Sequence, residues 1–309
     1  MQPSMNGPTP SFRKVLLATD FSAASQAAFQ TALGVCTALQ ADLSILHVFE
    51  YSDAFPPETG RELLELDNFY QTDQSSLESL REEALRAGVS CKATMVRGTA
   101  SLVIIETIRA DQIDLVVLGT SALHGFERLV FGSTAEEVLR EAPCPVLTVG
   151  PQVAGLANSG RFEGPVVFAT DFHRITAQAI RYAASFCEMT KSPLHCLHVL
   201  PRTLEGGSQN RVVPLVVTEA LHHVAIESGA AIYTPVYAVT YGSEISNAVV
   251  EYAKQHRARM IVLGVRQASM LASHLPAHIA YRIITEAPCP VVTIAFASKP
   301  QSTLAAACL

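Results

Sequence analysis

The chain has 309 residues, of which 49% are hydrophobic and 16% are charged, so apolar burial can offset the entropy of ordering the chain and wholesale disorder is excluded. The formal net charge is -6 at pH 7 and Lys and Arg form no block, which argues against a nucleic-acid surface. No apolar run reaches the roughly 18 residues of a membrane span, and the N-terminus lacks the apolar core of a signal peptide, so we expect a cytoplasmic protein without membrane partners.

Short apolar runs alternate with segments of helical periodicity through the first 150 residues. We expect strands at 14–19, 43–49, 89–96, 114–119 and 145–149, and helices at 22–40, 67–87, 100–111 and 133–141. Gly88 provides a C-terminal stop for the second helix, and Pro143 and Pro145 suit a strand start or an edge strand. The alternation predicts an open parallel sheet with helices on both faces.

The second part of the chain repeats the first. The sequence "ATDF" occurs at 18–21 and 169–172, and "EAPCPV" occurs at 141–146 and 286–291. A repeat of roughly 140 residues is far longer than that of a solenoid and predicts tandem domains. We expect domain 1 at 1–150, a Gly-rich linker at 151–164 and domain 2 at 165–309.

The first repeat contains, in order, the motifs "LLATDFS", "LHVFE" and "DLVVLGTSALHGFERLVFGSTAEEVLREAPCPVLTV". Their order resembles the universal stress protein family, and the resemblance runs along the whole of each repeat. It implies two tandem Rossmann-like α/β domains, each an open five-stranded parallel sheet of strand order 3-2-1-4-5 with helices on both faces. It also implies that the loop after the fourth strand binds ATP.

The family's loop has a glycine, two residues, a second glycine, nine residues, and then Gly followed by Ser or Thr. Gly119 and Gly132 have the right separation, Ser133 follows, and Gly125 matches a frequent family glycine. Ala122 stands where the second glycine is expected. If this position needs a left-handed backbone, alanine costs about 1–2 kcal/mol, and we expect weakened rather than abolished binding.

Ligands of open α/β sheets bind at the carboxyl ends of the strands, where the strand order reverses. With the order that the resemblance implies, this point lies between the first strand, which ends at Asp20, and the fourth, which ends at Gly119. Gly119 would let the backbone approach a phosphate. The run 132–134 opens a helix whose free N–H groups favour an anion. Ser133 and Glu136 also have the spacing of a capping box, so this tip could instead be a capped helix start alone.

Asp20 has two interpretations. It could accept a hydrogen bond from an adenine amino group or a ribose hydroxyl, or it could be the N-cap of the first helix, a role that Ser22 could also fill. By the resemblance, Ala18, Thr19 and Val48 offer backbone groups to the base. The full expected nucleotide-binding set is Ala18, Thr19, Asp20, Val48, Leu118, Gly119, Ser121, Ala122, Gly125, Gly132, Ser133 and Thr134.

The second repeat keeps the strand end but loses the loop. Asp171 is retained, whereas Gln267 and Met270 take the places of Ala122 and Gly125. The closing Gly-Ser becomes 277–278, Ala-His. We therefore expect domain 2 to be degenerate as a nucleotide site and to be structural or regulatory.

The last strands of the two repeats, 145–149 and 290–294, are alternating apolar edges that would invite uncontrolled pairing if exposed. We expect them to pair within the chain as a pseudo-dimer, and two chains could associate further into a homodimer. His274 and His278 have helical i, i+4 spacing but no evident third ligand, so we expect no metal site. The seven cysteines lack close spacing and indicate reduced thiols.

The favoured hypothesis is a cytoplasmic stress-response protein that binds ATP, with Mg²⁺ as a candidate counter-ion, through domain 1. The alternative is a tandem stress protein that binds no nucleotide and acts as an interaction or scaffold module. Ala122 and the degenerate second loop favour the alternative. The sequence shows no positioned general base or metal cluster, so we do not expect an enzyme.

Overall fold

The computed structural model describes residues 10–50, 59–120, 132–153, 164–173, 177–205, 212–266 and 279–296. Ten strands form one sheet: β1 Lys14–Thr19, β2 Asp42–Phe49, β3 Cys91–Arg97, β4 Leu115–Gly119, β5 Val146–Val149, β6 Val166–Ala169, β7 Leu194–Pro201, β8 Val236–Gly242, β9 Met260–Arg266 and β10 Val291–Phe296. The helices are α1 Ala23–Leu39, α2 Gly60–Arg86, α3 Ala100–Asp111, α4 Ser133–Glu141, α6 Ile180–Thr190, α7 Val212–Glu227, α8 Ile245–Gln255 and α10 Ile279–Glu286, with 3-10 turns η2 Arg202–Leu204 and η3 Ala230–Tyr233.

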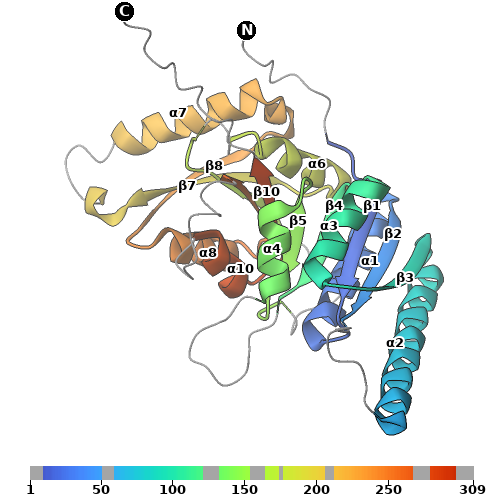
Figure 1. Cartoon of the computed structure of the whole chain (residues 1–309). Helices are drawn as coiled ribbons and strands as arrows, with labels where there is room; N and C mark the ends of the chain where they lie inside the picture. Colours follow the sequence, from blue (N-terminus) through green and yellow to red (C-terminus); the bar gives the residue numbers. More distant parts are fainter. Residues whose placement is uncertain are drawn as a thin grey trace, which may run out of the picture.

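The strands lie in the order β3-β2-β1-β4-β5-β10-β9-β6-β7-β8 (Figure 1). Pairing is parallel within each repeat, and the first strand of each repeat is the third from the outer edge. Each repeat therefore has the order 3-2-1-4-5. The strand order reverses beside β1, which places a crevice between the carboxyl ends of β1 and β4.

The two repeats join through their last strands. β5 and β10 pair antiparallel, with Leu147 opposite Val292 and Thr148 opposite Val291. The hydroxyl of Thr148 donates to the carbonyl of Val291 over 3.0 Å, so its buried oxygen has a partner. The predicted pairing of the last strands is confirmed. Both strands begin after a proline, as expected of strand starts, but they are central in the joined sheet.

Helices cover both faces of the sheet, as the alternation of elements predicts. The hydrophobic core on one face contains buried residues of α1, α2, α6 and α7, and the core on the other face contains those of α3, α4, α8 and α10. Phe12 stacks on Phe186 with ring centroids 4.7 Å apart, which ties the N-terminal segment of the first repeat to α6 of the second. The first core therefore continues across the junction.

One helix differs from its expected bounds. α2 starts at Gly60, seven residues before the predicted position 67, because residues 61–66, RELLEL, are all good helix formers. It ends at Arg86, and Gly88 follows with φ of 80°, the left-handed conformation that stops a helix. α3 and α4 have the predicted bounds.

The other candidate groups lie as follows. The six cysteines of the described ranges form no disulfide, and burial raises the pKa of Cys144 and of Cys289 to about 12. His222 and His223 are exposed on α7, while His274 and His278 lie outside the described residues. Within the described ranges, no three potential metal ligands cluster and no helix has the length and apolar character to cross a bilayer.

Candidate functional site

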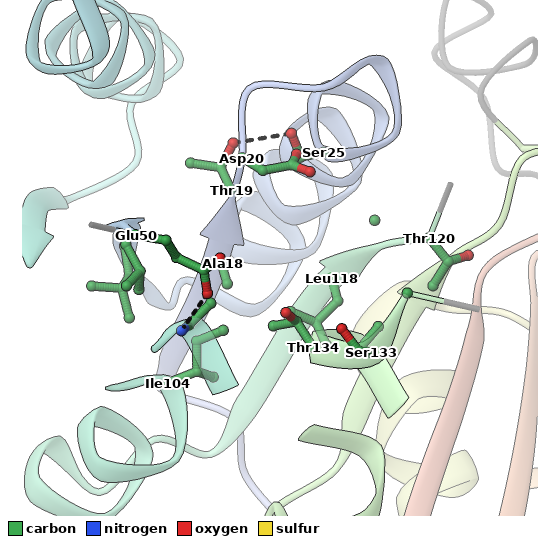
Figure 2. A pocket seen from close by; sticks show the side chains of 16 residues that line it. Ala18, Thr19, Asp20, Ser25, Glu50, Ile104, Leu118, Thr120, Ser133 and Thr134 are labelled. Atoms are coloured by element: carbon green, nitrogen blue, oxygen red, sulfur yellow. Dashed lines mark hydrogen bonds between the residues drawn. The ribbon is translucent and has the colours of Figure 1, made fainter. Parts of the chain in front are cut away.

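A pocket of about 390 Å³ opens at the carboxyl ends of β1 and β4 in the first repeat (Figure 2). Nine members of the expected nucleotide-binding set line it: Ala18, Thr19, Asp20, Val48, Leu118, Gly119, Gly132, Ser133 and Thr134. Ser121, Ala122 and Gly125 lie outside the described residues. Side chains from three strands and the first turn of α4 thus meet at one cavity of a size typical for small ligands.

The sequence argument missed seven lining residues: Ser25, Leu46, Glu50, Ala100, Ile104, Thr120 and Ala135. Thr120 and Glu50 directly follow the ends of β4 and β2, so their place at the carboxyl edge of the sheet was a usable signal. Ala100 and Ile104 come from the first turns of α3, and only the packing of α3 beside β2 brings them to the pocket.

The turn between β1 and α1 presents Asp20 to the pocket. Phe21 has φ of 59°, a left-handed conformation uncommon for a bulky residue, and its N–H donates to the hydroxyl of Thr19 over 3.1 Å. The N–H of Ser22 donates to Asp20 Oδ1 over 3.0 Å, and Ser22 Oγ accepts from the N–H of Ser25. Ser22 is therefore the N-cap of α1, so the N-cap interpretation of Asp20 is wrong.

Asp20 is ionised more readily than an ordinary aspartate. Desolvation raises the pKa of its carboxyl, but hydrogen bonds from the side chain and backbone of Ser22 and from Ser25 outweigh it and leave the pKa below its usual value. A negatively charged acceptor with an exposed face thus lies at the pocket wall.

His47 on β2 contacts this turn through its imidazole ring. Its Nδ1 lies 2.8 Å from the carbonyl oxygen of Thr19, its Nε2 lies 3.2 Å from Asp73 Oδ2 on α2, and the ring of Phe21 packs 4.5 Å away. A carbonyl and a carboxylate are both acceptors, and each faces one ring nitrogen of His47. The histidine and its partners are mostly buried and fix the backbone on which Asp20 stands.

The second repeat builds the same turn. Phe172 has φ of 61°, and its ring lies 4.5 Å from that of His198. The Nδ1 of His198 lies 2.8 Å from the carbonyl oxygen of Thr170. Asp171 Oδ1 accepts from the N–H of His173, as Asp20 does from Ser22. The "ATDF" and "LHV" matches between repeats therefore correspond to one shared structural unit.

Two glycines of the loop serve different needs. A Cβ on Gly119 would lie 2.6 Å from the backbone nitrogen of Ser25 and closer still to the carbonyl of Ala24. Gly119 is thus required for the packing of α1 against β4, a need that is separate from the predicted approach of a phosphate. A Cβ on Gly132 would meet no atom of the described residues within 4 Å, and its φ is -64°. Within the part of the chain that the structure describes, neither packing nor backbone conformation requires a glycine at 132.

The first turn of α4 faces the pocket without a side-chain cap. Gly132 is the N-cap and Ser133 is already the first helical residue, so the capping box of Ser133 and Glu136 is not formed. The N–H of Glu136 instead donates to the carbonyl of Gly132 over 3.0 Å. Ser133 and Thr134 bring hydroxyls to the pocket beside the positive end of the helix dipole. This is a surface suited to an anion.

The pocket is electrostatically divided. Asp20 and Glu50 supply carboxylates, and Glu50 Oε1 accepts from the N–H of Ala100 over 2.9 Å. Figure 2 shows Glu50 at the left of the pocket and Asp20 near its top, and Ser133 and Thr134 at the lower right. The lining residues that the structure describes include no Lys or Arg.

The corresponding region of the second repeat is only partly described. Gln267, Met270, Ala277 and His278 lie outside the described residues. Ile279, which aligns with Thr134, is 44% exposed at the start of α10. An apolar side chain therefore replaces a hydroxyl at the helix start.

Comparisons with known proteins agree with this fold. The profile of the universal stress protein family matches residues 11–150 and again 164–295. Universal stress protein MJ0531 of Methanocaldococcus jannaschii is 30% identical over 140 residues, which are 45% of this chain and 82% of that protein. The crystal structure of a universal stress protein from Archaeoglobus fulgidus superposes with a TM-score of 0.68 at 20% identity, covering 91% of this chain and 97% of the other.

A structure of protein PA1789 from Pseudomonas aeruginosa, described as functionally unknown, superposes with a TM-score of 0.59 at 16% identity and covers 93% of this chain and 94% of the other. At such identities the superpositions speak for the fold alone. The double profile match covers most of the chain, with one match on each repeat. The chain belongs to the universal stress protein family and contains two of its domains in tandem.

Proposed function

We propose that the pocket of the first repeat binds an adenine nucleotide, ATP, and that the second repeat is structural or regulatory. One observation carries the proposal: the pocket joins Asp20, directly after β1, to the start of α4 at Gly132, where no described side chain or backbone contact requires a glycine. A ligand that must approach the backbone closely accounts for that glycine. We also propose a cytoplasmic role in stress response, without catalysis, with domains at 1–150 and 165–309.

The division of charge sets the direction of the ligand. Val48, Ile104 and Leu118 provide apolar wall for an adenine ring. Asp20 can accept a hydrogen bond from the base amino group or a ribose hydroxyl, which an ionised carboxylate does well. The phosphates then point to Ser133 and the N–H groups of α4. In the opposite direction the phosphates would meet two carboxylates.

Because no described lining residue is a cation, we propose that Mg²⁺ neutralises part of the negative charge of the phosphates. A triphosphate brings several negative charges to a pocket whose own carboxylates are Asp20 and Glu50. The helix dipole alone offsets only about half a charge. We therefore expect ATP affinity to fall when magnesium is removed.

The test is an ATP titration of the full chain by calorimetry, with magnesium, for wild type and two variants. Gly132→Val places a branched side chain on the pocket side of the α4 start, so it should abolish binding, while the poorer N-cap lowers the melting temperature only slightly. Gly34→Ala is the matched control, because a Cβ at that α1 position also meets no atom within 4 Å but lies outside the pocket lining. It should bind as wild type does.

Ala122→Gly separates the two functional hypotheses. If the methyl group is the present defect of the loop, this variant binds ATP more tightly than wild type. Absence of wild-type binding at millimolar ATP, together with no gain in Ala122→Gly, would overturn the nucleotide proposal. The interaction or scaffold role would then be the better account of the protein.

A further inference from the structure

We propose that two copies of this chain associate through the outer end of the second repeat, where the edge strand β8 and the helix α7 present an apolar surface. Among the described residues β8 pairs only with β7, so its other edge has no strand beside it. Its sequence, VYAVTYG, contains no charged residue and no proline. Edge strands that stay single normally carry such residues to prevent pairing.

Helix α7 exposes several large apolar side chains. Its sequence, VVPLVVTEALHHVAIE, has two glutamates and no Lys or Arg. Val212, Leu215, Val216 and Ile226 are 61%, 69%, 61% and 52% exposed. The exposed side of α7 carries these apolar side chains among Glu219, His222, His223 and Glu227, and only Leu221 and Ala225 are fully buried. Among the described residues, nothing buries the apolar side chains on this side, so they are available for a partner.

The helix and the edge strand form one continuous surface. The ring of His222 on α7 lies 5.4 Å from that of Tyr237 on β8, so this flank of the helix lies beside the edge strand. The segment that joins the two elements adds Ile232, 78% exposed, and Val236, 47% exposed. We call Leu215, Ile226, Ile232 and Val236 the outer patch. Figure 1 shows α7 at the end of the molecule opposite α2.

In the first repeat, the corresponding edge strand and helix carry charged residues that disfavour pairing with another chain. Its edge strand β3 carries Lys92 and Arg97, and Lys92 pairs with Asp111 over 2.5 Å. Helix α2, which packs on β3 as α7 packs on β8, is rich in charged residues along its 27 residues. The two repeats share one fold but thus differ in how many charged residues their outer strand and helix carry. The difference favours a partner for the second repeat alone.

A second copy fits the outer patch best. An edge strand can pair antiparallel with its own copy across a twofold axis, as β5 and β10 already pair inside the chain. The strand has no charge that would repel its copy. The 16 residues of α7 span about 24 Å. If the contact is as long as α7 and as wide as one helix layer plus one sheet layer, about 10 Å each, the two copies would bury about 1,000 Å² in total. This is about the smallest buried area of a specific interface.

Sedimentation velocity of the full chain at concentrations from about 1 to 100 µM tests the proposal. We expect a reversible dimer in wild type. Leu215→Lys and Ile232→Lys should each raise its dissociation constant tenfold or more. Leu64→Lys is the matched control, because Leu64 on α2 is 68% exposed against 69% for Leu215. It should change the dissociation constant less than twofold.

Amide exchange identifies the strand involved. In the dimer the amides of 236–242 should exchange more slowly than in Leu215→Lys at the same protein concentration. A wild-type chain that stays monomeric at about 100 µM overturns the proposal. So does a dimer that Leu64→Lys weakens as much as Leu215→Lys, or one whose 236–242 amides exchange as in the monomer.

Discussion

At the residue scale, the two repeats share a left-handed phenylalanine over a histidine that holds the end of the first strand. In both repeats Nδ1 of the histidine contacts a threonine carbonyl, of Thr19 or of Thr170. The repeats differ at the other ring nitrogen: Nε2 of His47 contacts Asp73, whereas no carboxylate contact to Nε2 of His198 is found among the described residues. The extra charged partner stiffens the turn in the repeat that we propose to be competent. His47 is thus a positioning residue for Asp20.

This contrast makes a prediction. His47→Gln should weaken ATP binding about fivefold, because one hydrogen bond worth about 1 kcal/mol no longer fixes the turn beneath Asp20. His198→Gln should destabilise the fold comparably and leave ATP affinity unchanged. Calorimetric titration together with melting temperatures decides the matter. Equal losses of affinity in both variants would show a merely structural effect.

Asp20 predicts a dependence of stability on pH. Its folded-state pKa lies below the 3.8 of an ordinary aspartate, so the unfolded chain takes up a proton first as the pH falls. The stabilisation is therefore complete above about pH 5 and is lost as the pH falls through the folded-state pKa. Urea unfolding of wild type and Asp20→Asn at pH 6 and pH 3 measures it. The two proteins should differ more at pH 6; a larger difference at pH 3 would contradict the sign.

Some site residues were within reach of the sequence and others were not. Ala18, Thr19 and Asp20 follow from the end of a buried run, and Ser133 follows from the start of a helix. The packing reason for Gly119 was beyond the sequence, since the close approach of α1 is a tertiary contact. Ile104 reaches the pocket from α3, the helix between β3 and β4, and no local sequence pattern predicts that contact.

At the element scale, the packing of α1 on β4 depends on Gly119. Gly119→Ala should lower the free energy of unfolding by about 1–3 kcal/mol or more, because the added methyl overlaps backbone that cannot move aside. Gly34→Ala should instead raise it by about 0.5–1 kcal/mol, since it removes a helical glycine without a clash. Urea denaturation of both variants provides the comparison. A neutral Gly119→Ala would refute the proposed packing role.

Element boundaries show where local sequence stops being sufficient. α3 and α4 were predictable to the residue because a small or polar residue, Thr99 or Gly132, directly precedes each helical pattern. The start of α2 was not: the predicted start is 67, whereas the good helix formers of 61–66 extend the helix back to Gly60. The cap of α4 was also mistaken: two residues, Gly132 and Ser133, each suit an N-cap, and only the backbone geometry selects the first.

At the scale of the whole molecule, the repeats should unfold together. The core on the α1 and α6 face runs through Leu147 and Val292, both fully buried on the paired last strands. Scanning calorimetry should therefore show one transition whose calorimetric and van't Hoff enthalpies agree. Two separated transitions would mean that the junction carries little of the stability.

The joined sheet was predictable because the repeat places an apolar strand at the same end of both domains, and such edges pair. The difference between the repeats at the ligand site was predictable only in part. The sequence shows the loss of Gly132 and Ser133 equivalents in the second copy. It does not show that Asp20 and Glu50 lie together on one side of the pocket, since that depends on the strand order.

The central claim is that one nucleotide binds per chain, in the first repeat. Photo-crosslinking with an azido-ATP, followed by peptide mapping, tests it most directly. The account predicts saturable labelling of one site, at peptides that contain 18–20, 46–50 or 132–134, and its loss with excess ATP. Saturable labelling confined to residues 164–296, or labelling that excess ATP does not displace, would contradict it.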